Sequence, residues 1–383
     1  MSVPGGLVRI GAVARKEFRH LGRDWRVLAA VLVLPIFELL LFSYAISFDV
    51  RDVPTVVVDA DRTPASRAYL QAYETSTFFR VLGEASDADA ADRLFDADAA
   101  RVVVIVQPGF ERAIAAGEKA QVGVLIDGSE PNAARIGQTY ALALNQVYGQ
   151  QIAAQWADRQ GLDLSASGRL EPRLRTWYNP ERSSSIFLTP GLMVVIIMIV
   201  TVQQTAVSLV RERDLHTQEQ LLVSPLRQVE LMVGKLLPWT LLAFADMLVI
   251  AGLGLTVFGV PLRGSVAVLA GASALFVFCS LGLGLLVSAV APSMETANIL
   301  ALLGSFLPAF LLSGFAFPLE SIPAPLQWLS CLFPARFMVS ISRAVFLKGA
   351  GLAETWPDVA ALAAYALVVL VASTALYARR SRR

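Results

Sequence analysis

Long runs of uncharged, apolar residues recur along the chain and dominate its pattern. Each run holds about 20 residues, enough for a helix rising about 1.5 Å per residue to cross the roughly 30 Å hydrocarbon core of a bilayer. The pattern predicts an α-helical polytopic membrane protein with about six transmembrane helices. The predicted spans are residues 28–48, 186–210, 236–258, 266–290, 298–317 and 359–377.

Residues 49–185, between the first two spans, read instead as water-soluble sequence. β-Branched runs predict strands at 53–59, 100–106 and 121–126, and helical periodicity predicts helices at 65–75, 108–117 and 131–161. The insert is therefore predicted to be a small α/β domain with a mixed sheet. Two acidic clusters are interpreted as a solvated face, because no nucleophile, metal ligand set or phosphate loop accompanies them. These clusters are Asp59 with Asp61, and Asp87 with Asp89 and Asp92. A docking or gating module is expected.

Composition supports the membrane assignment and removes several alternatives. Of 383 residues, 55% are hydrophobic and 16% charged, against about 45–50% and about 25% in ordinary soluble domains. These values exclude a soluble enzyme and a disordered protein. With only Cys279 and Cys331, a secreted disulfide scaffold is excluded as well. The net charge of +1 indicates no particular partner, and no nucleic acid is expected.

Basic residues predict the orientation of the chain. Residues 1–27 mix basic and apolar positions and are expected to form an amphipathic helix at the cytoplasmic interface; an ordinary polybasic tail is the alternative. With that end inside, the short inner segments hold about 14 Lys and Arg, and the short outer segments hold about four. Both termini are therefore predicted to be cytoplasmic, with the domain at 49–185 extracytoplasmic and the first span a retained anchor.

A charged, amphipathic segment follows the second span. Within residues 211–235, leucines alternate with arginine, glutamate and glutamine, which predicts a short helix on the membrane surface. Ser224-Pro225 ends this helix, because proline lacks an amide hydrogen and clashes with the preceding turn. A second run, 229–235, then leads into the third span. The segment is either a lever for a soluble partner or a solvated connector, and the pattern alone favours neither.

Prolines interrupt the region between the fifth and the last span. Residues 318–357 hold two apolar pieces that are too short to cross a membrane, broken among others by Pro318, Pro323 and Pro334. They predict half-helices that dip into the outer leaflet as a re-entrant hairpin. Because such backbone is tolerated only against protein or a wet cavity, the hairpin is expected to cap a pathway.

Two carboxylates fall near the middle of predicted spans: Glu38 in the first and Asp246 in the third. A charge there costs at least about 2.5–3.5 kcal/mol, so each should face protein or water, or stay protonated. In one interpretation they line a transport route and favour cationic substrates. In the other, they form protonated hydrogen bonds between helices, with Gln203 and Gln204 as candidate partners.

The segment after the second span resembles the signature of the ABC-2 exporter permeases. The matching residues are Glu212, Arg213, Thr217, Glu219, Gln220, Leu221, Leu222, Ser224, Pro225, Leu226, Gly234 and Lys235. His216 departs from the family pattern, which has glycine there. The outer hairpin resembles the same family through Ser313, Gly314, Phe315, Pro318, Pro334 and Arg336. The resemblance covers most of the chain, and the large insert is typical of the drug-efflux-like branch.

This resemblance implies a permease subunit and not an enzyme. It identifies residues 211–235 as the coupling helix, which sits in a groove of a cytosolic ABC ATPase. Since this chain has no Gly-rich loop ending in Gly-Lys-Ser/Thr, ATP and Mg are expected on that partner, and no cofactor or metal on this chain. A second copy or a paralogue, membrane lipid and a periplasmic adaptor are the other expected partners.

The implied activity is export of an amphipathic small molecule or drug across the bacterial cytoplasmic (inner) membrane. Two other classes stay open. One is a receptor or scaffold that carries an outer sensor domain and performs no transport. The other is a membrane-embedded enzyme, for which Glu38 and Asp246 are the only candidate residues.

Overall fold

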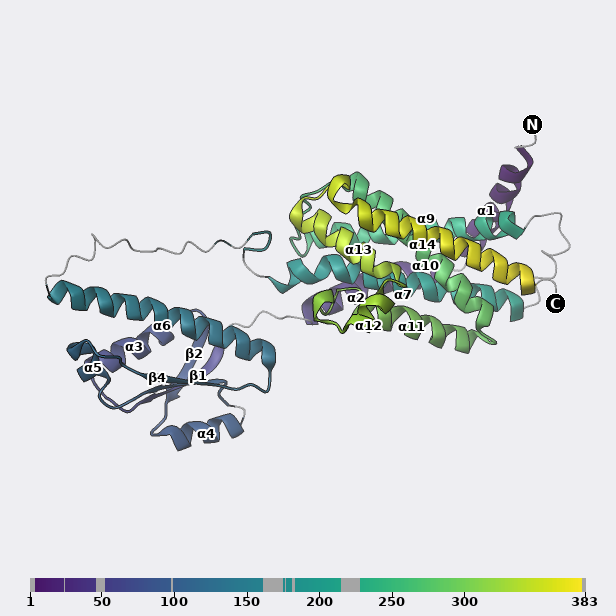
Figure 1. Cartoon of the computed structure of the whole chain (residues 1–383). Helices are drawn as coiled ribbons and strands as arrows, with labels where there is room; N and C mark the ends of the chain where they lie inside the picture. Colours follow the sequence, from purple (N-terminus) through teal and green to yellow (C-terminus); the bar gives the residue numbers. More distant parts are fainter. Residues whose placement is uncertain are drawn as a thin grey trace. The chain divides into compact units, whose positions relative to one another are not determined.

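The chain folds into two compact units, which are described separately. One comprises Met1–Ser47 with Thr176–Arg383, and the other Phe48–Arg175 (Figure 1). The computed structural model describes residues 4–23, 25–45, 52–97, 99–160, 175, 177–180, 183–214 and 228–380. The first unit is helical and the second contains a β-sheet, and we call them the helical unit and the α/β unit.

Five helices of the helical unit are long and apolar enough to cross a membrane. They are α7 (Ser184–Asp214), α9 (Gln228–Thr256), α10 (Val266–Val290), α11 (Met294–Leu311) and α14 (Leu352–Arg380). Helix α2 (Trp25–Ala45) covers most of the first predicted span, but its apolar stretch, Val31–Ala45, is shorter. A bent pair of helices would raise the count to six. The predicted class, a polytopic helical membrane protein, is confirmed.

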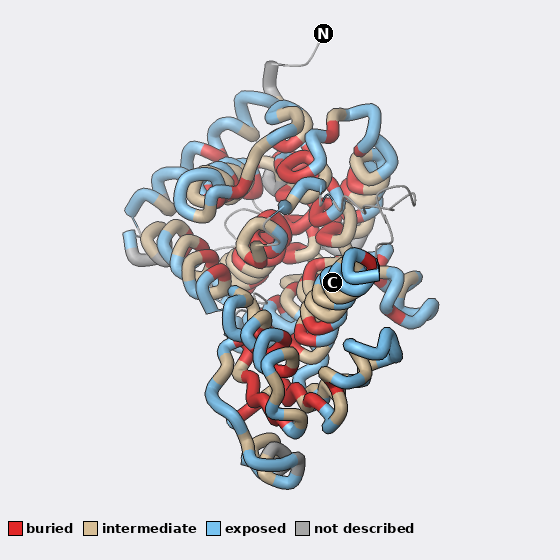
Figure 2. The backbone as a smooth tube through the Cα atoms, turned by 90° about the vertical axis from the view of Figure 1, so that its left-hand side faces the viewer, coloured by how far each residue is buried: buried red, intermediate tan, exposed pale blue. Residues whose placement is uncertain are grey.

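Helix α7 lies at the centre of the helical unit. Its apolar stretch is 78% buried, against 22–50% for the other four long helices. It packs against α2, α9, α10 and α11, and against α13 (Pro334–Arg343). A helix that is apolar on all sides is stable only when other helices surround it. Figure 2 shows the buried positions gathered in the interior. Among the described residues, the run from Leu188 to Met198 contributes six of the twelve largest fully buried side chains.

The α/β unit holds a four-stranded mixed sheet of order β2-β1-β3-β4. Strand β1 (Val53–Asp59) is parallel to β2 (Phe79–Glu84) and β3 (Val102–Val106), and β3 is antiparallel to β4 (Val122–Ile126). Helices α3 (Pro64–Glu74), α5 (Phe110–Ala116) and α6 (Pro131–Arg159) cover one face. Helix α4 (Ala88–Asp96) packs on the other face. The three predicted strands and the mixed sheet are found, whereas β2 and α4 were not predicted.

Two predicted boundaries are wrong. Helix α7 continues to Asp214 and α9 already begins at Gln228, so the described ends of the predicted separate helix 211–235 belong to these long helices. The residues after the last apolar position of α7 are charged helix formers without a breaker, which lets the helix continue. Helix α14 begins at Leu352, inside the predicted hairpin 318–357. The Glu354 carboxylate accepts the Gly351 amide at 2.7 Å and fixes this start, as in a capping box.

Candidate functional site

Most of the predicted coupling residues lie outside the described residues. These are Thr217, Glu219, Gln220, Leu221, Leu222, Ser224 and Pro225. Glu212 lies in the last turn of α7, and Arg213 is the one coupling residue whose side chain is described. The structure does place the two ends of the segment, at Asp214 and Gln228. We call this end of the helical unit the hinge end.

Arg213 ties the end of α7 to the turn between α10 and α11. Its Nη2 donates to the carbonyl oxygens of Ala291, at 2.8 Å, and Pro292, at 3.0 Å. Ala291 is the C-cap of α10, where carbonyl groups have no partner within the helix, so the guanidinium satisfies a position that needs a donor. Arg213 therefore links the last turn of α7 to this turn.

At the other end of the segment, Gly234 holds α9 against α1 (Pro4–Arg23). A β-carbon at Gly234 would lie 2.7 Å from Val13 Cβ and 3.0 Å from the Ile10 carbonyl oxygen. Both distances are too short for any larger residue, so glycine is what allows the two backbones to touch. The family-like Gly-Lys pair thus has a structural role here: Gly234 is the place where the N-terminal helix docks.

Charged residues surround this contact. Glu17 of α1 and Lys235 of α9 are 6% and 8% exposed, and their charges interact. Arg9 forms an ion pair with Glu230 at 3.7 Å, while Lys16 Nζ donates to Glu17 at 2.9 Å. A buried charge is tolerated when opposite charges lie close to it. Residues 1–27 are predicted only to lie at the membrane interface, whereas in the structure α1 also packs against the first turns of α9.

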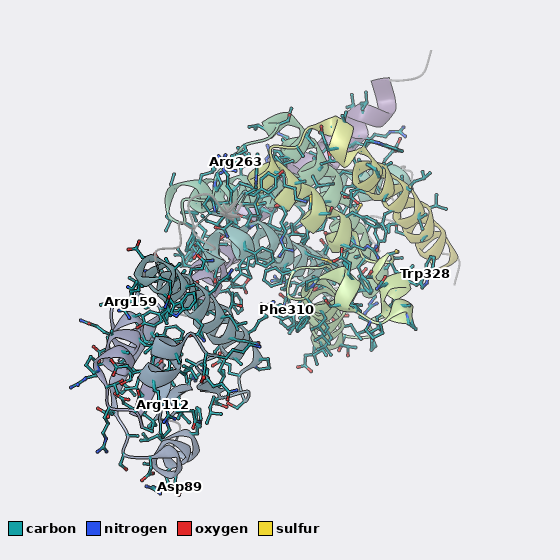
Figure 3. The ribbon with its side chains drawn as sticks, turned by 60° about the vertical axis from the view of Figure 1, so that its left-hand side comes forward. Asp89, Arg112, Arg159, Arg263, Phe310 and Trp328 are labelled. Atoms are coloured by element: carbon teal, nitrogen blue, oxygen red, sulfur yellow. The ribbon has the colours of Figure 1, made fainter. Side chains whose placement is uncertain are left out.

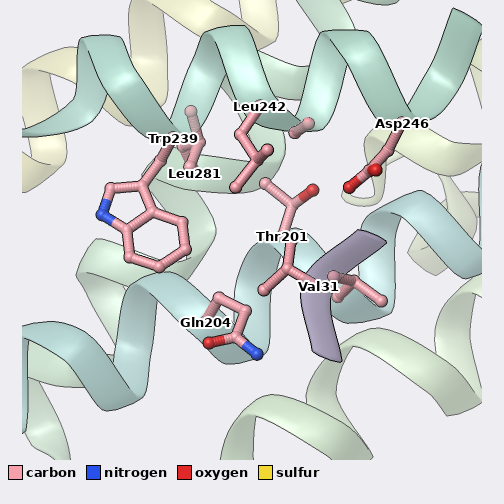
Figure 4. A pocket seen from close by; sticks show the side chains of 9 residues that line it. Val31, Thr201, Gln204, Trp239, Leu242, Asp246 and Leu281 are labelled. Atoms are coloured by element: carbon pink, nitrogen blue, oxygen red, sulfur yellow. The ribbon is translucent and has the colours of Figure 1, made fainter. Parts of the chain in front are cut away.

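Asp246 lies inside the helical unit, where it is 2% exposed. It lines a small cavity together with Thr201, Gln204 and Trp239 (Figure 4). Among the described residues, Asp246 Oδ2 and Thr201 Oγ1 have no hydrogen-bond partner. The hypothesis that Gln203 pairs with a membrane carboxylate is wrong, because its amide donates to Asn298 of α11 instead. Gln204 does reach the cavity of Asp246.

Glu38 is not brought together with Asp246. It lies on α2, its Oε2 is buried without a hydrogen-bond partner among the described residues, and it is not among the residues that line the Asp246 cavity. The described residues also contain no group of three or more His, Cys, Asp or Glu arranged to hold a metal ion. Glu38 is therefore not part of the cavity that Asp246 lines.

The opposite end of the helical unit, which we call the hairpin end, is closed by the turn after α11. Gly314 has a left-handed backbone, with φ of +83°, that suits glycine. Ser313 Oγ accepts the Phe315 amide at 3.2 Å. The ring of Phe315 is 2% exposed and fills a notch at Gly191 of α7, where a β-carbon would lie 2.5 Å from Phe315 Cδ2. The turn is thus seated directly on α7.

Arg343 of α13 fastens this turn. Its Nη1 and Nη2 donate to the carbonyl oxygens of Gly314, at 2.7 Å, and Phe315, at 2.9 Å, and its Cζ lies 4.1 Å from the centre of the Phe187 ring. In the sequence, Arg343 is one of about four basic residues of the short outer segments and has no distinguishing motif. Its partners are backbone carbonyls and an aromatic ring far away in the sequence, so no local motif could have identified it.

The predicted proline-broken hairpin is present as a bent pair of helices. Helix α12 (Ala324–Ser330) meets α13 with its π-helical extension to Lys348 at 88°. Pro318 precedes a short 3-10 helix, Leu319–Ser321, and Pro334 is the first residue of α13. Arg336 Nη1 donates to the Gln327 carbonyl at 2.7 Å and so fixes the bend. Trp328 of α12 is 78% exposed and points away from the unit (Figure 3).

The acidic clusters of the α/β unit hold turns and helix starts. Asp61 accepts the amides of Gly109, at 2.6 Å, and Glu111, at 3.0 Å; the Glu111 amide lowers the pKa of Asp61 most. Asp59 is only 7% exposed and accepts the Ser66 hydroxyl at 2.8 Å, and Asp87 caps α4. The solvated-face interpretation is therefore wrong for the buried Asp59 and incomplete for the half-buried Asp61. It holds for Asp87, which stays exposed although it caps α4, and for Asp89, which is exposed as well (Figure 3).

Comparisons with known proteins bear on both units. The family described as ABC-2 family transporter protein matches residues 25–375. The probable multidrug ABC transporter permease YbhS of Escherichia coli is 30% identical over 345 residues, 89% of each chain. The probable multidrug ABC transporter permease YbhR of the same organism is 28% identical over 379 residues, covering 98% of this chain and 99% of YbhR. The inner membrane transport permease YhhJ of Escherichia coli is 28% identical over 354 residues, 90% of each chain.

Proposed function

Because this chain belongs to the ABC-2 family of transporter proteins, we propose that it exports an amphipathic small molecule or drug, driven by a separate ATPase. The observation that carries this proposal is the match over residues 25–375, which includes all five membrane-length helices and the α/β unit between α2 and α7. Two relatives bear names of probable multidrug permeases, which supports a drug-like cargo.

The ATPase is proposed to bind the segment from Thr217 to Pro225 at the hinge end. Both flanks of this segment support the role, because each is tied to another element. Arg213 connects the end of α7 to the α10–α11 turn, and Gly234 seats α9 on α1. A force applied between these flanks reaches α1, α7, α9 and the α10–α11 turn together. ATP and Mg are assigned to the partner, since this sequence lacks a Walker-type phosphate loop.

Two such subunits, identical or paralogous, are proposed to work together in the bacterial cytoplasmic membrane, with lipid around them. The distribution of Lys and Arg supports cytoplasmic termini and hinge, and an outer location for the hairpin end and the α/β unit. In this orientation the α/β unit would be free to bind a periplasmic adaptor. The bent helices α12 and α13 would close the exit, held by Phe315 and Arg343.

The test is coupling in proteoliposomes that contain the full chain and its cognate ATPase. Replacing Glu219 by Lys, or Leu222 by Trp, should lower stimulation of ATP hydrolysis and export of ethidium, an amphipathic cation, by about tenfold, the size of a lost contact of about 1.4 kcal/mol. Glu320→Lys is the matched control, because it makes the same charge reversal at an exposed site of the hairpin end. Unchanged stimulation in both hinge variants would reject the coupling role.

The receptor or scaffold alternative predicts a different result in the same assay. A scaffold would neither bind the ATPase nor move ethidium, whatever residue stands at position 219. The membrane-enzyme alternative would need Glu38 and Asp246 to act together, and Glu38 is not among the residues that line the Asp246 cavity.

A further inference from the structure

Helix α6 of the α/β unit has a long surface without charge. One side of the helix packs on the sheet through Ala141, Leu144 and Tyr148, and Figure 1 shows the helix running along the unit. Between Arg135 and Asp158, α6 contains no Asp, Glu, Lys, Arg or His. Charged residues are common on surfaces that face water, and their depletion is typical of the core of an interface.

The exposed side of α6 is also apolar. Among the described residues of the α/β unit, large hydrophobic side chains are exposed at five positions, and three of them belong to α6. These three are Leu142, which is 61% exposed, Val147, which is 56% exposed, and Trp156, which is 37% exposed. Apolar surface of this kind is stabilised when another surface removes it from water. This side of α6 is therefore suited to a contact with another chain.

Exposed positions on this side repeat with the spacing of a coiled coil. Alternating steps of three and four residues connect one exposed stripe along α6, on the side away from the sheet. The members of this stripe are Thr139, Leu142, Gln146, Gly149, Ala153 and Trp156. Residues with this spacing form a seam against which a second helix can pack.

Gly149 gives the stripe room for the backbone of a second helix. It lies inside α6, where glycine weakens a helix. A β-carbon at Gly149 would have no other atom within 4 Å, so packing within the described α/β unit does not require glycine there. At Gly137, on the sheet side of the same helix, a β-carbon would lie 3.4 Å from Val102 Cγ2. A close approach from outside is a role for Gly149 that the unit itself does not supply.

The sizes of the side chains in the stripe fit a second copy of the stripe that runs in the opposite direction. Each larger side chain then lies opposite a smaller one, as a knob opposite a hole. In a parallel pair, by contrast, Arg135 would face Arg135 and Gly149 would face Gly149, which combines a repulsion with a gap. The antiparallel pairs are Leu142 with Ala153, Gln146 with Gly149 and Thr139 with Trp156.

We propose that the α6 helices of two copies of this chain pack against each other in opposite directions, about a two-fold axis that passes between Val147 and Tyr148. A two-fold axis makes every pair occur twice, as an interface between identical surfaces requires. The inference rests on the pairing of two subunits in the proposed function. It adds the surface through which their α/β units touch.

The experiment is disulfide cross-linking of the full chain in membrane vesicles. Two differently tagged copies are co-expressed, both with Cys331→Ser, because Cys331 is an exposed cysteine of the wild type. One copy carries Leu142→Cys and the other carries Ala153→Cys. Opposed positions of two closely packed helices lie within reach of a disulfide. We therefore expect most of the mixed pairs to cross-link under mild oxidation.

Two controls measure cross-linking by random collision. In an antiparallel pair, two Leu142→Cys residues would be separated by eleven residues along the helix axis, about 16 Å at about 1.5 Å per residue. Leu142→Cys alone should therefore cross-link at least tenfold less than the mixed pair. Leu125→Cys combined with Ala153→Cys should give the same low yield, because Leu125 is an exposed leucine of β4 and not of α6.

Gly149→Arg is the variant that should separate the helices. The arginine occupies the space of the second helix, so the yield of the mixed cross-link should fall at least tenfold. Gln151→Arg is the matched control, because Gln151 is also an exposed residue of α6 but lies about 200° around the helix axis from Gly149. It should leave the yield unchanged.

Three results would overturn the proposal: no mixed disulfide, an equal yield for Leu142→Cys alone, or an unchanged yield in Gly149→Arg. The number of chains per particle, measured by light scattering on the purified full chain, shows what else is lost. Two chains per particle without a mixed disulfide would reject the α6 contact and leave the pairing of subunits in place. One chain per particle would reject both.

Discussion

The two units of this chain treat their buried polar groups in opposite ways. In the described part of the α/β unit, every buried side-chain nitrogen and oxygen has a hydrogen-bond partner. In the helical unit six such atoms have none among the described residues. They are Glu38 Oε2, Ser43 Oγ, Thr189 Oγ1, Thr201 Oγ1, Asp246 Oδ2 and Arg343 Nε.

The contrast separates a unit whose buried polar groups are paired from one that leaves several of them unpaired. Tyr69 and Tyr73 of α3 both donate to Asn145 of α6, and Asp59 and Asp61 accept hydrogen bonds from a hydroxyl and from amides. In the helical unit, the six atoms named above have no such partner among the described residues. Because an orphaned group in a low-dielectric interior is costly, these groups are the ones expected to respond when the transporter changes state.

The largest expected effect is that of Arg343→Met at the hairpin end. Two hydrogen bonds from a charged donor and the contact with Phe187 disappear, although Nε is itself unpaired. Since a charged hydrogen bond contributes about 1.5–3 kcal/mol, we expect a loss of about 3 kcal/mol and a looser turn at Gly314 and Phe315. Hydrogen exchange of residues 312–317 measures this directly.

Arg263→Met serves as the control for Arg343→Met, because Arg263 is exposed. It should leave the exchange rates at 312–317 unchanged. Equal exchange rates in the wild type and in Arg343→Met would show that the hydrogen bonds of Arg343 Nη1 and Nη2 do not stabilise this turn.

Asn145→Leu in the α/β unit should have the second-largest effect. The leucine has a similar volume but leaves the Tyr69 and Tyr73 hydroxyls without their acceptor, which costs about 1–3 kcal/mol. Amide exchange in β1 and β3 should accelerate accordingly, and the neighbouring exposed Gln146→Leu should not change it. Adding Tyr69→Phe and Tyr73→Phe should recover part of the loss, because both partners are then apolar. If Asn145→Leu left amide exchange in β1 and β3 unchanged, the hydrogen bonds to Asn145 would not stabilise the α/β unit, and the contrast between the units would be rejected.

The sequence predicted elements well where one physical signal dominates. The strand Val102–Val106 is buried along almost its whole length and reads as a continuous β-branched run, so it could be recognised. The edge strand Phe79–Glu84 is mostly exposed and contains Arg80 and Gly83, so its pattern is that of a loop. The five membrane-length helices were predicted because each contains a long apolar run. The continuation of α7 to Asp214 is charged and was not assigned to that helix.

The candidate sites divide along a similar line. Asp246 could be identified because a carboxylate in an apolar run is conspicuous, but its neighbour Thr201 could not, since threonine in a helix usually bonds to its own backbone. Gly234 was noticed by resemblance, whereas its partner Val13 lies more than 200 residues away in the sequence. The partner predicted for Gln203 was wrong because several helices compete for each amide, and only packing selects among them.

Glu38→Gln should have the smallest effect on stability. The direction of the change in the thermal midpoint shows whether the Glu38 carboxylate has a partner. If Glu38 Oε2 is truly unpaired, replacing the carboxylate by a neutral amide of the same shape should leave the thermal midpoint unchanged or raise it slightly. Glu354→Gln is the matched control, because the Glu354 carboxylate accepts the Gly351 amide at 2.7 Å and caps α14. Glutamine still accepts this amide but removes the negative charge near the N-terminus of α14, which should cost about 0.3–1 kcal/mol.

The same Glu38→Gln variant also tests the transport route in proteoliposomes. If the carboxylate faces the cargo, export of a cationic probe should fall severalfold relative to a neutral probe of similar size, because only the cation loses an opposite charge. A midpoint that drops as far as that of Glu354→Gln would show that Glu38 is paired. Equal effects on both probes would remove Glu38 from the route while leaving the unpaired state of its carboxylate in place.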